Sequence, residues 1–140
     1  MYAYLDRPLG TLKSKERFVL ASMRAWVGAT RGGRCLCQAL THAFRHNGMA
    51  AALDDFCVIM TTLDSAAIGH LRFGSLDLAR VTDDEARILA LFDVARAGPL
   101  DRLRRVSAGL VQEDAVASLA QAVDFVAIAM ADTDTDTGRR

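Results

Sequence analysis

The arrangement of apolar and polar positions is most regular between residues 47 and 67. Apolar side chains recur there at alternating steps of four and three, which is the spacing of a helix face that packs against other helices. The residues in these positions are Met49, Leu53, Phe56, Met60, Leu63 and Ala67. Asp54, Asp55 and Thr61 fall on the opposite side of the same helix. The pattern predicts that this stretch is the central helix of a small bundle.

Helical patterns of the same kind cover most of the remaining chain. They predict helices that begin near Ser14, near Arg34, after Thr82, at Pro99 and near Glu113. Thr82 and the glutamate three residues later form a capping box, in which each side chain accepts the backbone N–H of the other residue. The Asn-Gly pair at 47–48 can take the left-handed conformation that ends the second helix. Such a short link makes the second and third helices antiparallel neighbours.

Residues 70–79 interrupt these helices with alternating apolar and polar positions around a Gly-Ser pair. A two-residue hairpin would place Leu71, Phe73, Leu76 and Leu78 on one face and would set Arg72 opposite Asp77. Two strands alone are marginally stable in water, so this face would have to lie on the helices. The alternative interpretation of the segment is an extended loop.

The composition agrees with a helical fold. Of 140 residues 51% are hydrophobic and only 2 are proline, which favours helix over sheet and is ample for one core. We therefore predict an all-α bundle of five or six helices, with the short extended or hairpin segment between helices three and four. Residues 1–131 would form a single domain, and residues 132–140 a disordered acidic and polar tail.

Charge and cysteine usage narrow the class of protein. The 17 basic and 17 acidic residues cancel, so no overall field attracts nucleic acid or an anionic membrane. We identify no run approaching the roughly 18 apolar residues of a membrane-spanning helix. Three cysteines form no disulfide framework, and Cys35 and Cys37 would diverge on a helix. A reducing cytoplasm is therefore the predicted location, without nucleic-acid or membrane partners.

Residues 80–90 read Arg-Val-Thr-Asp-Asp-Glu-Ala-Arg-Ile-Leu-Ala. This run, the segment 117–123 and the order of the first three helices resemble a family of small, helical, uncharacterised bacterial proteins. The resemblance implies a helical fold and no activity. Members of that family often carry a cysteine cluster just before the threonine, where this chain has Ser-Leu-Asp-Leu at 75–78. Any metal or redox role of the cluster would therefore not transfer to this chain.

His42 and His46 are the candidate metal ligands. They are four residues apart on the second helix, the spacing with which two imidazoles can hold one ion. Cys35 shares their side of the helix but lies about 10 Å along its axis from the first histidine, too far to join them. Further ligands would have to come from Asp54, Asp55, Cys57 or His70. The alternative interpretation is a pair of solvated surface histidines.

No catalytic constellation accompanies these elements. Three histidines without a nucleophile motif beside them do not define a triad, and the paired aspartates suit a polar helix face or a first helical turn. Arg102, Arg104 and Arg105 spread over an outer face rather than forming a recognition helix. We therefore predict a non-catalytic interaction or regulatory protein with no cofactor. The alternative is a small-ligand- or metal-binding protein with a site between helices two and three.

The last helix carries apolar residues on two sides. Its seam is centred near Leu119, Val123 and Val126, whereas Phe125 and Ile128 fall on the other side among polar residues. Either the hairpin or the first helix covers these two residues, or a second copy of the chain does. Two-fold dimers are the commonest soluble oligomers, so a homodimer with Phe125 and Ile128 in its interface is the preferred prediction.

Overall fold

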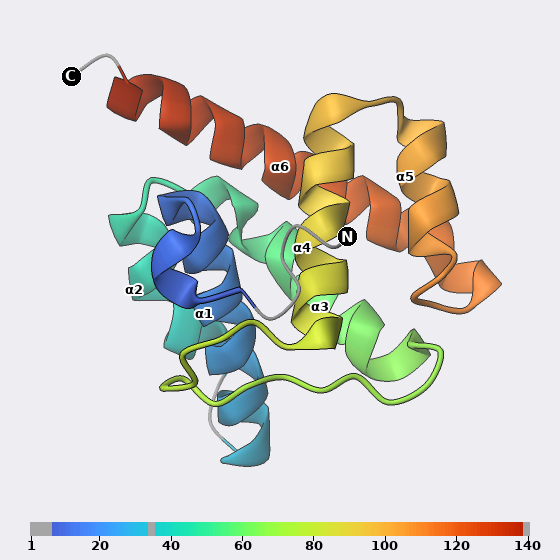
Figure 1. Cartoon of the computed structure of the whole chain (residues 1–140), viewed down its shortest axis with the longest axis horizontal. Helices are drawn as coiled ribbons and strands as arrows, with labels where there is room; N and C mark the ends of the chain where they lie inside the picture. Colours follow the sequence, from blue (N-terminus) through green and yellow to red (C-terminus); the bar gives the residue numbers. More distant parts are fainter. Residues whose placement is uncertain (1–6, 34–35, 139–140) are drawn as a thin grey trace.

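The computed structural model describes residues 7–33 and 36–138, and within this part the protein is an all-α bundle of six helices without strands (Figure 1). The predicted fold class is therefore confirmed. The helices are α1 (Ser14–Arg31), α2 (Leu36–His46), α3 (Leu53–Ala66), α4 (Asp83–Ala97), α5 (Leu100–Ser107) and α6 (Val116–Gly138). Short 3-10 turns occupy Leu9–Thr11, Ala50–Ala52 and Glu113–Ala115.

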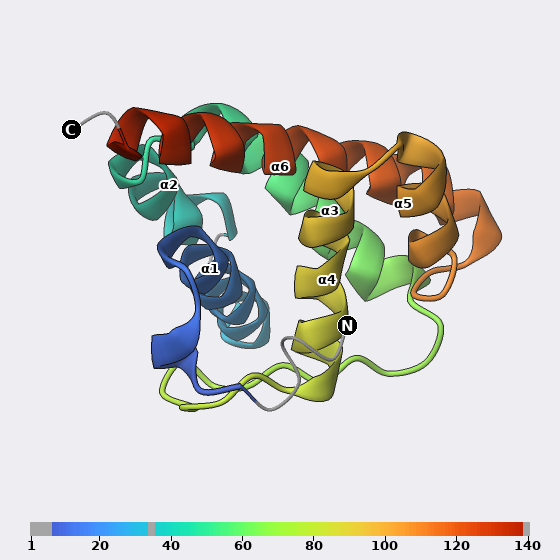
Figure 2. The same cartoon turned by 45° about the horizontal axis from the view of Figure 1, so that its top comes forward.

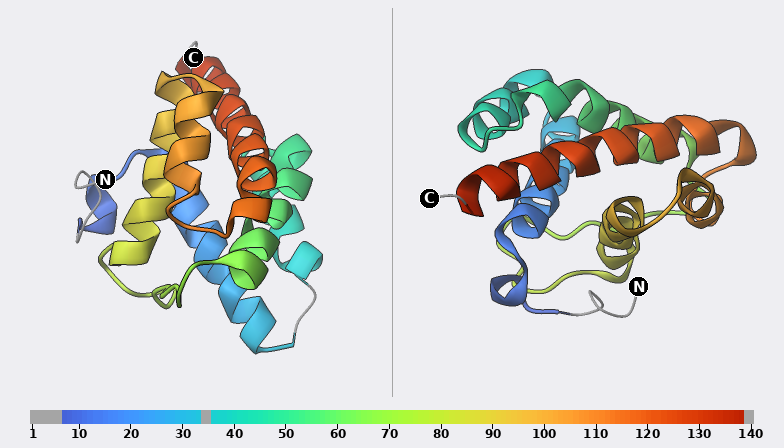
Figure 3. Two further views of the ribbon diagram at one scale, coloured as in Figure 1. Left: turned by 90° about the vertical axis from the view of Figure 1, so that its right-hand side faces the viewer. Right: turned by 90° about the horizontal axis from the view of Figure 1, so that it is seen from above.

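The central element of the bundle is α6. It runs the length of the molecule between α3 on one side and α4 and α5 on the other (Figures 2 and 3). The sequence analysis gave this position to the helix within residues 47–67, and that assignment is wrong. Small buried residues explain the difference, because Ala120, Ala122 and Ala127 flank the predicted seam of α6 and let neighbouring helices approach on both sides.

The part of the predicted apolar seam that lies within α3 is nevertheless confirmed, whereas Met49 and Ala67, the two ends of the predicted seam, lie outside the helix. Its buried residues join those of α1, α2, α4 and α6 in one continuous core. Gly48 has a φ of 72°, in the left-handed region where a side chain would be strained. The N–H of Met49 donates to the carbonyl oxygen of Phe44 at 2.8 Å, and that of Gly48 donates to Arg45 at 3.2 Å. This pair of bonds ends α2 as a Schellman motif, as the Asn-Gly pair predicted.

Glutamate side chains fix the starts of two helices, α4 and α1. At α4 the capping box is confirmed: Thr82 Oγ1 accepts the N–H of Glu85 at 3.2 Å, and Glu85 Oε1 accepts the N–H of Thr82 at 2.9 Å. At α1, where the sequence predicts a helix that begins near Ser14, this serine is the first helical residue and Lys13 holds the N-cap position. The carboxylate of Glu16 accepts the N–H of Lys13 at 3.0 Å, so the start of the helix is fixed one residue earlier.

The segment between α3 and α4 is an extended loop, and the hairpin alternative is not formed. The N–H of Arg72 donates to Asp84 Oδ2 at 2.6 Å, and the carbonyl oxygen of Arg72 accepts the Thr82 hydroxyl at 2.9 Å. Backbone groups that a hairpin would pair with each other therefore bond to the first turn of α4, where side chains offer charged and hydroxyl partners. Leu76 is consequently 65% exposed instead of lying on a shared apolar face.

Helix α6 extends further than predicted. It continues through Gly138, into the stretch expected to be a disordered tail, whereas residues 139 and 140 lie outside the described part. Adding residues to an existing helix needs no new nucleus, which offsets the modest helix propensity of Thr and Asp.

Residues Glu113–Asp132 also have the length and mean hydropathy, 1.5, of a membrane-spanning helix. The sequence analysis identified no such stretch. The central helix of a folded bundle meets the same criteria, because it too must be apolar on several sides.

Candidate functional site

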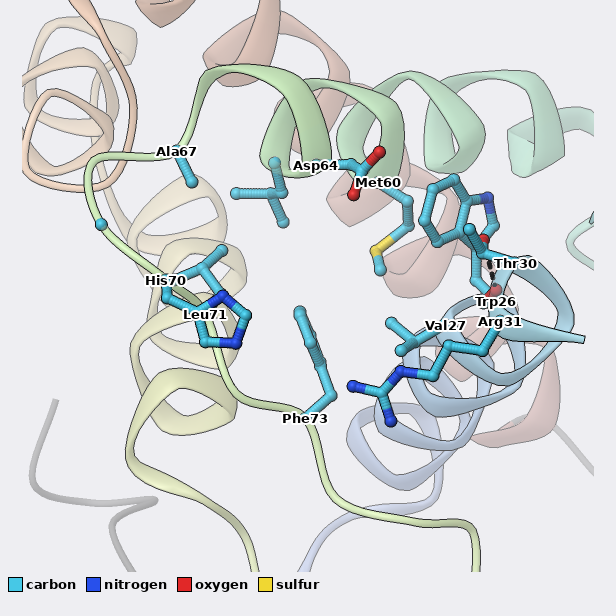
Figure 4. A pocket seen from close by; sticks show the side chains of 12 residues that line it. Trp26, Val27, Thr30, Arg31, Met60, Asp64, Ala67, His70, Leu71 and Phe73 are labelled. Atoms are coloured by element: carbon cyan, nitrogen blue, oxygen red, sulfur yellow. Dashed lines mark hydrogen bonds between the residues drawn. The ribbon is translucent and has the colours of Figure 1, made fainter.

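A hollow of about 280 Å³ lies between α1, α3 and the first part of the loop after α3 (Figure 4). Its walls are mainly apolar and come from all three segments: Trp26 and Val27, Met60 and Leu63, and Leu71 and Phe73. The extended course of the loop creates this space, because it places Leu71 and Phe73 opposite the two helices without filling the gap between them. The sequence analysis placed its alternative ligand site between helices two and three, and the hollow lies elsewhere.

Three ionisable side chains surround the mouth of the hollow. Arg31 is the last residue of α1, Asp64 belongs to the last turn of α3, and His70 follows in the loop. Figure 4 shows them on three different sides of the opening. All three are exposed, and within residues 7–33 and 36–138 none of them takes part in an ion pair or hydrogen bond. The sequence analysis did not select Arg31 or Asp64.

Trp26 belongs both to the core and to the wall of the hollow. It is buried in the core, and Figure 4 shows the six-membered edge of its indole beside Met60 at the wall of the hollow. Its Nε1 has no hydrogen-bond partner among the described residues. The Thr30 hydroxyl donates to the carbonyl oxygen of Trp26 at 2.9 Å, which ties the polar side of this wall to the helix backbone.

The predicted histidine pair lies on the outer face of α2. His42 and His46 are both exposed, and their rings stack with centroids 6.2 Å apart. The four further candidates do not join them: Asp54, Asp55 and Cys57 lie on α3, and His70 is at the hollow. In the described ranges no three His, Cys, Asp or Glu side chains are grouped closely enough to hold a metal ion. Cys35, which was considered with this pair, lies outside the described residues.

A buried ion pair joins α1 to α4. Arg24, which is 3% exposed, donates from Nε and Nη2 to the two carboxylate oxygens of Glu85 at 2.8 and 2.9 Å. The same guanidinium donates to the carbonyl oxygens of Leu78 and Arg80, both at 2.8 Å. Glu85 also accepts the N–H of Gly74 at 2.9 Å. One arginine therefore fixes the two helices and the second half of the loop relative to each other.

Glu85 makes the stability of the fold depend on pH in the acidic range. Burial raises the pKa of this carboxyl, but the bonds from Arg24 and from the N–H groups of Thr82 and Gly74 outweigh burial, so the pKa lies below its ordinary value. The folded chain thus releases this proton more readily than the unfolded chain. The contribution of Glu85 to stability is complete above the ordinary glutamate pKa of about 4.3 and is lost as the pH falls through the lower folded-state value.

We expect Glu85→Gln to remove this part of the acid dependence. Urea unfolding measured between pH 7 and pH 3 should show a shallower decrease of the unfolding free energy for the variant than for the wild type. Glu113→Gln is the matched control, because Glu113 is exposed, and its pH profile should follow that of the wild type. If the unfolding free energy of Glu85→Gln fell with pH in parallel with that of the wild type, Glu85 would not be a source of the acid dependence.

The α6 residues selected from the sequence lie on the surface. Phe125 is 50% exposed and Ile128 is 54% exposed, whereas Leu119, Val123 and Val126 are buried as predicted. Neither α1 nor the loop between α3 and α4 buries the two residues, so the intrachain alternatives do not hold for the described part of the chain. They form a one-turn apolar patch on the outer side of the central helix.

Comparisons of the chain with protein-family models, with curated proteins and with solved structures found no match. The resemblance to small bacterial helical proteins therefore stays an expectation from the sequence.

Proposed function

We propose that this protein is a non-catalytic interaction or regulatory protein that acts as a homodimer through α6. The observation that carries the proposal is the half-exposed pair of Phe125 and Ile128 on one face of that helix. Burying one large apolar side chain is worth about 1.5–3 kcal/mol, which favours a covered state for this patch. The balanced charge supports a protein partner over nucleic acid or a membrane, and the cytoplasm remains the proposed location.

A second copy of the chain is the partner that this patch suits best. The two residues are three positions apart, so they lie one above the other on the helix surface. A two-fold axis beside α6 would bring the same pair from each copy into contact, as an isologous interface requires. Polar residues on the same outer side, among them Ser118 and Gln121, are exposed and would form the rim.

We expect the wild type to elute as a dimer at micromolar concentration and Phe125→Asp to elute as a folded monomer. Burying a carboxylate without a partner is costly, so the substitution should weaken association by at least two orders of magnitude. Light scattering coupled to size exclusion measures the mass, and circular dichroism confirms that the variant is folded.

Ile68→Asp provides the matched control for this experiment. Ile68 is 55% exposed but lies in the loop after α3, where its N–H donates to the carbonyl oxygen of Leu110, and it is not part of α6, so the variant should remain dimeric. A wild-type monomer would refute the homodimer. A folded dimer retained by Phe125→Asp would show that the interface lies on another surface.

A second candidate function, the binding of a small ligand, is favoured by the hollow between α1 and α3. Native mass spectrometry combined with elemental analysis of the purified protein separates the candidates. A stoichiometric small molecule would support ligand binding. A stoichiometric metal that is lost on replacing His42 and His46 with Ala would support the metal version instead.

A further inference from the structure

We propose that the hollow between α1, α3 and the following loop binds a small apolar zwitterion, for which an apolar α-amino acid is the simplest example. The carboxylate of the ligand would face Arg31, its ammonium group would face Asp64, and its apolar body would lie against Trp26 and Met60. This proposal concerns a different surface from the α6 patch and does not depend on the homodimer.

The shape and lining of the hollow set the size and the apolar character of the ligand. A volume of about 280 Å³ lies just below the usual range of ligand pockets, which is about 300–1,000 Å³. Met60, Leu63 and Trp26 belong to the continuous core, so the deep wall is rigid and apolar. Such a site favours a small molecule over a drug-sized one.

The charged residues at the mouth of the hollow determine which charged groups the ligand should carry. Arg31 carries a permanent positive charge on a planar fork that matches a carboxylate. Asp64 presents the opposite charge from the α3 side, and Figure 4 shows its carboxylate across the opening from the Arg31 guanidinium. Arg31 and Asp64 form no ion pair with each other, since their charged groups are more than 4.0 Å apart. A ligand that carries both charges satisfies both groups at once, whereas a simple acid or amine leaves one unmatched.

Two further features support this orientation. Helix α3 ends at Ala66, so Asp64 lies in its last turn, where the backbone carbonyl groups favour a cation such as the ligand ammonium. His70 stands on the third side of the opening and can donate a hydrogen bond to the carboxylate. The mouth is therefore negative on the α3 side and rich in donors on the opposite sides.

The single tryptophan of the chain makes the site directly observable. Trp26 is the only Trp in the sequence and forms part of the wall, so its fluorescence reports on occupancy. Three probes share one apolar body and differ in charge: phenylalanine is the zwitterion, 3-phenylpropionate the acid and phenethylamine the amine. We expect phenylalanine to give a saturable change and to bind at least tenfold more tightly than either of the others. Isothermal titration calorimetry provides an independent affinity.

Two variants, each of which replaces one charged side chain with a neutral one, test which residue contacts which charge of the ligand. Arg31→Gln should weaken phenylalanine about tenfold and leave phenethylamine unchanged, because only the carboxylate loses its partner. Asp64→Asn should weaken phenylalanine by a similar factor and leave 3-phenylpropionate unweakened. Arg105→Gln and Asp54→Asn are the matched controls, since both residues are exposed and neither lines the hollow.

The outcomes that would overturn the proposal are distinct from those that test the dimer. Absence of saturable binding by all three probes, in protein shown by circular dichroism to be folded, would refute the site. An acid or amine that binds as tightly as phenylalanine would refute the zwitterion. Equal losses in the Arg31→Gln variant and the Arg105→Gln control would refute the assigned carboxylate contact.

Discussion

Replacing Arg24 with Met should lower the free energy of unfolding by about 3–5 kcal/mol, the cost of leaving a buried charge without its partner. Glu85 is 0% exposed and would lose both of its guanidinium donors while remaining in the core. The carbonyl oxygens of Leu78 and Arg80 would lose theirs as well. Urea denaturation followed by circular dichroism at pH 7 measures this loss.

A second substitution separates the buried charge from the lost packing. In the Arg24→Met background, Glu85→Gln removes the unpaired charge. Thr82 and Gly74 donate their N–H groups to different carboxylate oxygens of Glu85, so the single amide oxygen of glutamine keeps one of these two bonds. The double variant should therefore recover part of the stability, so that the two effects are not additive. Arg105→Met on the exposed side of α5 should change stability by less than about 0.5 kcal/mol. A loss below 1 kcal/mol for Arg24→Met would contradict the role of the pair.

The ion pair also shows where sequence reasoning stops. Glu85 was recognised as the third residue of a capping box, because that role depends only on neighbours in the sequence. Its partner is 61 positions away on α1, and spacing along one helix shows which side a residue faces but not what it meets. A local signal did exist, since Arg24 lies among the buried residues Leu20 and Met23. A charged side chain on an apolar face calls for a buried partner.

Local features were predicted correctly for the same reason. The seam of α3, the Schellman ending at Gly48 and the seam of α6 depend on residues within one or two turns of each other, and the structure confirms them. For the loop after α3, the alternation of apolar and polar residues suits a hairpin and an extended course equally well. The first turn of α4 decides between them by offering Asp84, Thr82 and Glu85 as partners.

Of the candidate sites, too, only the one that depends on neighbours within a single helix could be predicted from the sequence. Phe125 and Ile128 could be selected from helical periodicity alone, because an apolar side chain on a polar face is visible in one helix. Arg31 and Asp64 could not, since each is an ordinary residue near the end of its own helix. They form a possible site only because α1 and α3 end beside the same loop (Figure 4). The spacing of residues along the chain does not predict that these two helix ends lie close together.

Phe44→Ala should destabilise the protein by about 3–5 kcal/mol, because it opens a cavity where three helices meet. Phe44 of α2 is fully buried, and its ring centroid lies 4.9 Å from that of Phe18 on α1 and 5.1 Å from that of Phe56 on α3. At this chain length each kcal/mol corresponds to roughly 2–4 °C, so the melting temperature should fall by about 6–20 °C.

The neighbouring phenylalanines distinguish a junction from general loss of apolar area. Phe18 is half-buried and touches the cluster from one side, so Phe18→Ala should cost clearly less than Phe44→Ala. Phe44→Leu keeps most of the buried volume and should recover more than half of the loss. Calorimetric melting of the three variants tests this order. If Phe18→Ala and Phe44→Ala were equally destabilising, the contact between α1 and α2 alone would account for the effect, and Phe44 would not join three helices.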